Sequence, residues 1–152
     1  MTVIIRQMLL SDIPSVVAID QQSFSLPWPE TSYRYELQSN AASRSFVAEG
    51  EAREVVAMIV SWLILDELHI ATIASSLAHR RRGIGSQILI AALKDAQAAG
   101  ASRAFLEVRA GNEVAQAMYR KFGFTCTGKR VAYYRDNGED AVLMTLEPLE
   151  LL

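Results

Sequence analysis

The sequence is poor in the residues that build disulfides and metal sites. Its one cysteine, Cys126, cannot form a disulfide within the chain, so nothing indicates a disulfide-stapled secreted protein. A catalytic thiol needs a nearby base and a lowered pKa, and we expect Cys126 instead to be a half-buried residue of a strand. The two histidines, His69 and His79, fall on different expected elements without metal-ligand spacing, which predicts no metal site.

An excess of positive charge and a long hydrophobic run are also missing. The formal net charge is −2, whereas nucleic-acid-binding domains are usually basic, so we expect no direct nucleic-acid partner. The longest apolar run, residues 55–65, contains Ser61 and is shorter than the roughly 20 residues that cross a bilayer. The first ten residues include Arg6 and Gln7, and no signal-peptide cleavage pattern follows them. We therefore expect a cytoplasmic chain without a membrane partner.

The remaining composition is that of a folded domain. Hydrophobic residues make up 51% of the chain and charged residues 21%, which is enough apolar material for one compact domain over residues 1–152. The expected strands are residues 2–8, 45–49, 55–65, 69–75, 104–108, 124–134 and 140–146, and the expected helices are residues 11–24, 30–38, 86–99 and 112–122. This order predicts an α+β (mixed α/β) domain. A turn signal at residues 136–138 predicts that the last two strands form a hairpin.

A glycine-containing turn, residues 80–85, lies between an expected strand and the clearest expected helix. Its sequence is Arg-Arg-Arg-Gly-Ile-Gly. The first N–H groups of a helix have no partner within the helix, and glycines let a phosphate approach them closely. The neighbouring arginines would add charge-assisted contacts. The alternative is that Gly83 and Gly85 only shape a turn and that the arginines are solvated.

Other phosphate-binding loops fit this turn less well. A Walker loop needs a Lys-Ser or Lys-Thr pair after its last glycine, and none follows Gly85. A dinucleotide fingerprint needs a third glycine, but Gln87 or Ile88 occupies that place. The turn therefore indicates a pyrophosphate-containing ligand that is neither a simple nucleoside triphosphate nor NAD.

Two later segments resemble a known family. Residues 106–112 read Leu-Glu-Val-Arg-Ala-Gly-Asn, and residues 115–124 read Ala-Gln-Ala-Met-Tyr-Arg-Lys-Phe-Gly-Phe. With the turn at residues 80–85 and the tail Tyr-Tyr-Arg-Asp-Asn-Gly-Glu-Asp-Ala at residues 133–141, they resemble the GNAT superfamily of N-acetyltransferases. Within it, the chain resembles the RimI-like family of ribosomal-protein-alanine N-acetyltransferases. The resemblance covers residues 4–144, almost the whole chain.

The resemblance implies a fold and a cofactor. The GNAT-like fold has a central, mostly antiparallel twisted sheet of about seven strands flanked by about four helices. The cofactor is acetyl-CoA (CoA), held by the glycine turn, the end of the preceding strand and the last helix. The residues that the resemblance places against it are Ile73, Ala74, Ser75, Arg80, Arg81, Arg82, Gly83, Ile84, Gly85, Ser86, Asn112 and Tyr119.

The resemblance also implies a catalytic pair. Glu107 would act as the base that deprotonates the attacking amine, with partial burial raising its pKa. Tyr119 would act as the acid that protonates the leaving thiolate, because a phenol (pKa about 10) and a thiol (about 8.5) are nearly matched. A backbone N–H near Ser75 or Ser76 would stabilise the oxyanion. The alternatives are a surface carboxylate that pairs with Arg109 and a tyrosine that packs in the core.

The acceptor implied by the resemblance is the N-terminal amine of a protein, an alanine of a ribosomal protein. Its groove would be lined by Trp28, Tyr33, Glu107, Tyr133 and Tyr134, although Tyr33 and Tyr133 are equally consistent with core aromatics.

The chain departs from the RimI-like pattern at one loop. Ser75-Ser76-Leu77 replaces the usual apolar residue and Asp-Pro pair, and Gly111 stands where a serine is common. These departures keep open a GNAT enzyme for another amine, such as a lysine side chain, a polyamine or an amino acid. A second alternative is that the protein is not an enzyme but a module that only binds acetyl-CoA. The presence of both Glu107 and Tyr119 argues against this alternative.

Overall fold

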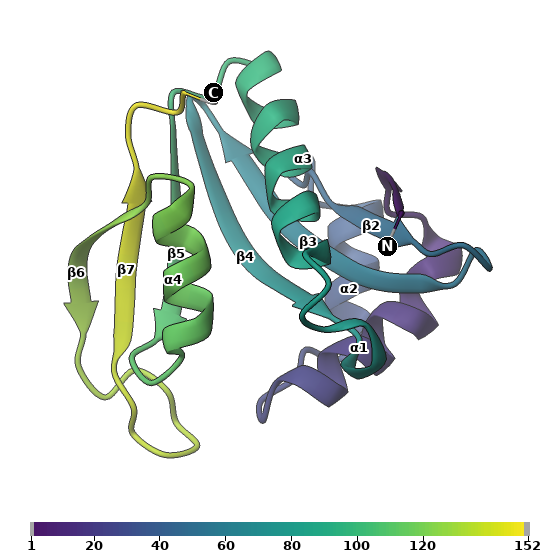
Figure 1. Ribbon diagram of the computed structural model, residues 1–152, viewed down its shortest axis with the longest axis horizontal. Coiled ribbons are helices and arrows are strands. Elements are labelled where there is room, and N and C mark those ends of the chain that lie inside the picture. The colour runs from purple at the N-terminus through teal and green to yellow at the C-terminus, as the bar shows by residue number, and fades with distance from the viewer. Residues whose placement is uncertain (1, 151–152) are drawn as a thin grey trace.

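A computed structural model describes residues 2–150 of the chain. Its seven strands form one sheet in the order β1-β2-β3-β4-β5-β7-β6 (Figure 1). The strands are β1 Ile4–Gln7, β2 Phe46–Glu49, β3 Val55–Ile64, β4 Glu67–Ser75, β5 Arg103–Arg109, β6 Thr125–Arg130 and β7 Ala141–Leu146. The α-helices are α1 Ile13–Ser23, α2 Glu30–Gln38, α3 Ile84–Ala98 and α4 Glu113–Lys121, and two short 3-10 helices are Leu10–Asp12 and Leu77–His79.

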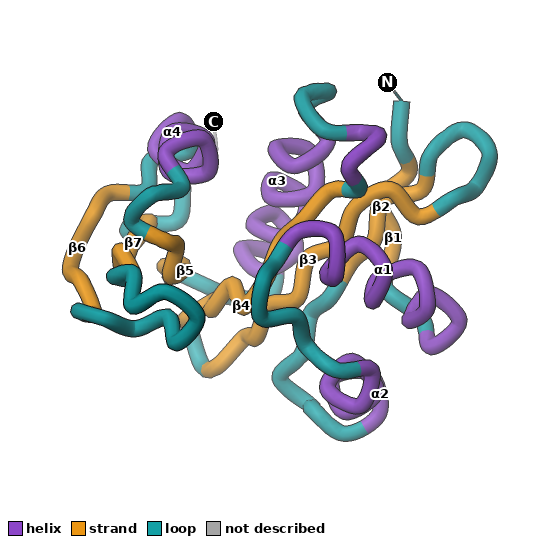
Figure 2. The backbone as a smooth tube through the Cα atoms, turned by 90° about the horizontal axis from the view of Figure 1, so that it is seen from below, coloured by secondary structure: helices purple, strands orange, loops and turns teal. Residues whose placement is uncertain are grey.

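Every pair of neighbouring strands is antiparallel except β4 and β5, which are parallel and joined through α3. A parallel pair needs a long crossover, and α3 supplies it. Helices α3 and α4 cover one face of the sheet, whereas α1 and α2 cover the other (Figure 2). The predicted α+β class and the mostly antiparallel seven-stranded sheet with four helices are confirmed.

The core has two parts because the central strand β3 is buried on both faces. Val56, Ala57 and Ile59 pack with α3 and α4, while Met58 and Val60 pack with α1 and α2. The apolar stripe of α3 lies fully in the first part; its buried members are Ile84, Ile88, Leu89, Ala92, Leu93 and Ala96. This rigid layer holds the start of α3 and the end of β4 in fixed positions.

Strands β4 and β5 pair only over their first four residues, from Glu67 with Arg103 to Ile70 with Leu106. Beyond Ile70, β4 runs on to Ser75 without pairing to β5, and the two strands diverge (Figure 1). The register of β4 against β3 shifts at the same point, so that Ala71 forms a bulge. A bulge bends and twists its strand, and here it separates β4 from β5 and opens the centre of the sheet.

Two expectations about the C-terminal part are wrong. Strands β6 and β7 pair antiparallel, which confirms the predicted hairpin, but β6 ends at Arg130 instead of residue 134. Residues 131–140 form a long loop instead, in which Asp136 and Glu139 bind Arg109 of β5. Cys126 is exposed, not half-buried, because β6 is the edge strand and is exposed along most of its length.

Candidate active site

A groove of about 640 Å³ runs between the end of β4, the start of α3 and helix α4. Gly83 precedes α3 with φ +75°, a left-handed conformation that favours glycine, and the helix begins at Ile84. The groove is lined by eleven of the twelve predicted cofactor residues, namely Ile73, Ala74, Ser75, Arg80, Arg81, Gly83, Ile84, Gly85, Ser86, Asn112 and Tyr119. Arg82 is not among its lining residues.

The basic residues of the turn have different contacts. The Arg80 guanidinium donates to the carbonyl of Ser75 (3.3 Å) and to the hydroxyl of Ser23 (2.9 Å), so it ties the turn to β4 and α1. Arg81 and Lys121 line the same groove, one on either side. The groove therefore has positive charge at the end where the N-terminus of α3 opens into it.

The exposed edge of β4 provides backbone groups along the groove. The N–H of Ser76 donates to the carbonyl of Val56 (2.8 Å), so Ser76 cannot be the expected oxyanion donor. Successive N–H groups of a strand point to opposite edges, and the N–H of Ser75 therefore faces away from β3, toward the gap. Of the two expected donors, only Ser75 remains.

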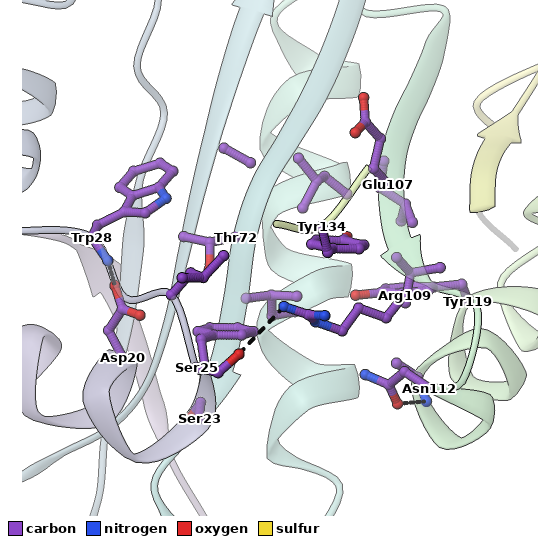
Figure 3. A pocket seen from close by; sticks show the side chains of 18 residues that line it. Asp20, Ser23, Ser25, Trp28, Thr72, Glu107, Arg109, Asn112, Tyr119 and Tyr134 are labelled. Carbon is purple, nitrogen blue, oxygen red and sulfur yellow. Dashed lines mark hydrogen bonds between the residues drawn. The ribbon is translucent and has the colours of Figure 1, made fainter. Parts of the chain in front are cut away.

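A second pocket, of about 510 Å³, fills the gap between β4 and β5 (Figure 3). Trp28 and Asp20 lie on its α1 side, while Glu107 and Tyr134 lie across from them on the β5 side. Four residues line both this pocket and the groove: Ile73, Asn112, Ala115 and Tyr119. A ligand in the groove and a ligand in the pocket would thus meet at Tyr119. We call the two sites the cofactor groove and the acceptor pocket.

Glu107 lies in the acceptor pocket with its side chain partly buried. Leu106 and Val108 are buried on the opposite side of β5, as expected from strand alternation, whereas Glu107 is exposed. Its carboxylate accepts from the Nε of Arg130 (3.2 Å). The residue as a whole is exposed, but its side chain is 32% exposed, which agrees with the expected partial burial. The alternative partner, Arg109, is bound elsewhere.

Tyr119 is buried where the two sites meet. Only 5% of the residue is exposed, and its ring packs against Phe124 at 5.8 Å between centroids. Burial, with a smaller contribution from Tyr134, raises the pKa of Tyr119 above its ordinary value of 10. Asn112 caps α4 by accepting from the N–H of Ala115 (3.1 Å), as predicted, and so fixes the helix that carries Tyr119.

The predicted acceptor residues divide into three positions. Trp28 and Tyr134 line the acceptor pocket. Tyr133 lines an adjoining pocket of about 620 Å³ that also contains Trp28, Glu107 and Tyr134, and the charge of Glu107 raises the pKa of Tyr133. Tyr33 is fully buried beside Trp28 and lines none of these pockets, so the alternative of a core aromatic is correct for it.

The sequence interpretation missed Arg109, which organises the mouth of the acceptor pocket. Its guanidinium binds Asp136 (2.9 Å) and Glu139 (3.3 Å) and stacks on the ring of Tyr134 at 3.9 Å from the centroid. It also donates to the hydroxyl of Ser25 (3.4 Å), which joins the α1–α2 connection to the 131–140 loop. Its position two residues after Glu107 on one strand was the available signal, because such residues share a face.

The segment of residues 13–124 matches the model of the acetyltransferase (GNAT) family. The chain belongs to this GNAT family. The predicted superfamily is therefore confirmed, and with it an acetyl-CoA-dependent N-acetyltransferase.

Relatives of this GNAT protein include enzymes named for a ribosomal protein. It is 35% identical over 140 residues to a Bacillus subtilis protein named as a candidate ribosomal protein bS18-alanine N-acetyltransferase, with 92% of each chain covered. The solved ribosomal-protein-S18-alanine N-acetyltransferase of Escherichia coli has 27% identity and a TM-score of 0.89, covering 99% of this chain and 96% of that one. Ard1 of Thermoplasma volcanium has 28% identity and a TM-score of 0.90, with 99% and 100% covered. The predicted RimI-like relationship is confirmed.

Two further features concern only the part of the chain that is described. Among the helices of residues 2–150, none combines the length and the apolar character needed to cross a membrane. Within the same residues, no three histidine, cysteine or acidic side chains are grouped closely enough to bind a metal ion.

Proposed function

We propose that this GNAT protein transfers the acetyl group of acetyl-CoA to the N-terminal amine of a protein, an alanine of a ribosomal protein, in the cytoplasm. The observation that carries the proposal is the junction of the cofactor groove with the acceptor pocket at Tyr119, with Glu107 in the same pocket. The names of the relatives from Bacillus subtilis and Escherichia coli support the acceptor class.

The chemistry of the cofactor groove suits a pyrophosphate joined to an amide-bearing arm. The free N–H groups at the start of α3, with Arg81 and Lys121 beside them, would hold the phosphates. The unpaired edge of β4 up to Ser75 offers N–H and C=O groups to the amides of the arm. The arm would then deliver the thioester to the junction near Ile73 and Tyr119.

In the proposed mechanism, the amine attacks the thioester directly in a ternary complex. Glu107, directly or through water, removes the proton that prevents the amine from attacking. The N–H of Ser75 donates to the acetyl oxygen as that oxygen gains negative charge. Tyr119 gives its proton to the departing sulfur. The new C–N bond replaces the C–S bond, and no covalent enzyme intermediate is needed.

The shape of the site favours a chain over a small amine as the acceptor. The acceptor pocket shares Trp28, Glu107 and Tyr134 with the adjoining 620 Å³ pocket, so a bound peptide has space to continue past its first residue. A GNAT enzyme for polyamines, amino acids or lysine side chains is the second candidate, because Ser75-Ser76-Leu77 departs from the RimI-like pattern.

A thiol-release assay with acetyl-CoA tests the acceptor class. We expect release of CoA with a short peptide that begins Ala-Arg, and none with the same peptide after its N-terminus is blocked. Equal or faster turnover of a polyamine, a free amino acid or a lysine side chain would contradict the proposal and support the second candidate.

Substitution of Gly85 by tryptophan tests the cofactor groove. A Cβ at this position would lie 3.6 Å from the sulfur of Met118 and 3.9 Å from the hydroxyl of Ser75, so the indole would enter the groove. We expect acetyl-CoA to lose its effect on the melting temperature in Gly85→Trp. Gln87→Trp places the same side chain on the exposed side of α3 and should bind acetyl-CoA normally. Unchanged binding by Gly85→Trp would refute the assignment.

A further inference from the structure

A buried carboxylate forms part of the wall of the acceptor pocket. Asp20 lies near the end of α1, and only 1% of the residue is exposed. In Figure 3 its side chain lies below Trp28 on the α1 side of the pocket that it lines, across from Glu107 and Tyr134. The mechanism above gives Asp20 no part.

The two oxygens of Asp20 are in unequal situations. Oδ2 accepts from the backbone N–H of Trp28 (3.1 Å) and from the hydroxyl of Tyr33 (2.5 Å), so it holds the α1–α2 connection in place. Oδ1 is buried and has no hydrogen-bond partner among residues 2–150. A buried acceptor without a hydrogen bond destabilises the fold and is rare, and the destabilisation is larger when the acceptor belongs to a carboxylate. A donor supplied by a bound ligand would explain why Oδ1 has no partner within the protein.

No cation of the pocket wall serves this oxygen. The charged donor that lines the acceptor pocket is Arg109, and its hydrogen bonds go to Asp136, Glu139 and neighbouring groups of the two loops. The reacting amine is not the donor either, because the proposed mechanism places that amine at Glu107, which lies across the acceptor pocket from Asp20.

We propose that Asp20 Oδ1 binds the acceptor by accepting a hydrogen bond from a backbone N–H next to its N-terminal residue. Asp20 is then a binding residue that distinguishes a peptide from a simple amine, since only a peptide presents this N–H beside the reacting group. The inference rests on the proposed function, because it assigns the contact to a peptide acceptor.

Asp20→Asn tests this contact directly, because the structure determines which way the new side-chain amide is oriented. The Oδ2 position receives the N–H of Trp28, which can only donate, and the amide oxygen must therefore occupy that position. The amide nitrogen then takes the place of Oδ1 and presents a donor to the pocket. The variant keeps the contacts that support the fold and reverses only the group that faces the acceptor.

We expect Asp20→Asn to raise KM for an Ala-started peptide by about 10- to 100-fold, with KM for acetyl-CoA and the melting temperature near those of the wild type. The control Tyr33→Phe removes the other contact of the carboxylate and leaves Oδ1 unchanged. It should lower the melting temperature without raising the peptide KM. An unchanged peptide KM in Asp20→Asn, or an equal rise in both variants, would assign Asp20 a structural role only.

Acceptors in which an ester replaces the first or the second peptide bond identify the donor. An ester removes one N–H without adding bulk, so one of the two should raise KM in the wild type and add nothing further in Asp20→Asn. If the rises in KM caused by the ester and by Asp20→Asn add up in the combined measurement, the inference is overturned, although the activity on peptides stands. A wild-type enzyme that acetylates free amines and no peptide would overturn both the proposed function and this inference.

Discussion

Glu107→Gln is expected to lower kcat for an Ala-started peptide by about 100- to 10,000-fold, which is the usual contribution of a general base. The substitution keeps the size of the side chain and removes its ability to accept a proton from the amine. Since the contacts of the Glu107 side chain are an ion pair with the exposed Arg130 and a hydrogen bond with the exposed Tyr133, the fold should be little affected. Steady-state kinetics by thiol release, with a melting curve for each variant, measures both effects.

A matched substitution separates loss of the base from loss of a surface charge. Glu113 is an exposed glutamate in the first turn of α4, and the proposed mechanism gives it no part. Glu113→Gln should therefore keep the wild-type kcat. If Glu107→Gln and Glu113→Gln both stay within about threefold of the wild type, Glu107 is not the base, whatever the acceptor turns out to be.

Tyr119→Phe is expected to lower kcat by about 100-fold or more, because the departing sulfur loses its proton donor. Burial raises the pKa of Tyr119 above 10, so this group keeps its proton through the range in which the enzyme is assayed. The pKa of Tyr119 is therefore less well matched to that of a thiol than the sequence suggests. The phenol gives up its proton only as negative charge develops on the sulfur. The kcat of the wild type should consequently show no fall between pH 7 and pH 10 that is due to this group.

The control is Tyr35→Phe on α2, where the tyrosine is 57% exposed. This variant should retain the wild-type kcat. A wild-type kcat in Tyr119→Phe would assign Tyr119 to core packing beside Phe124. A fall of the wild-type kcat below pH 10 that is absent in Tyr119→Phe would show instead that Tyr119 loses its proton in this range.

The departure at residues 75–77 keeps Ser75 in the lining of the cofactor groove. Ser75 still ends β4 at the edge of the groove, its carbonyl accepts from Arg80, and Leu77 begins a short 3-10 helix. The hydroxyl of Ser76 makes a hydrogen bond with the Nδ1 of His79 (2.6 Å), which stabilises this loop without the usual Asp-Pro pair.

The sequence by itself determined the order of elements, the family and the position of the glycine turn. These features are encoded locally: the stripe of α3 repeats at helical spacing, Gly83 supplies a left-handed conformation, and Asn112 caps the helix that follows it. Such signals depend on residues a few positions apart, so they can be recognised without knowing which elements meet.

Only the tertiary structure decided the surroundings of the candidate site residues. The exposure of Glu107 follows from the divergence of β4 and β5, and the long loop of residues 131–140 follows from the binding of Arg109 to Asp136, 27 residues away. Asp20 was missed because its partners Trp28 and Tyr33 come from the next segments, and the pocket that it faces is completed by β5. Burial and hydrogen-bond partners depend on which segments pack together, and that is not encoded in the spacing of nearby residues.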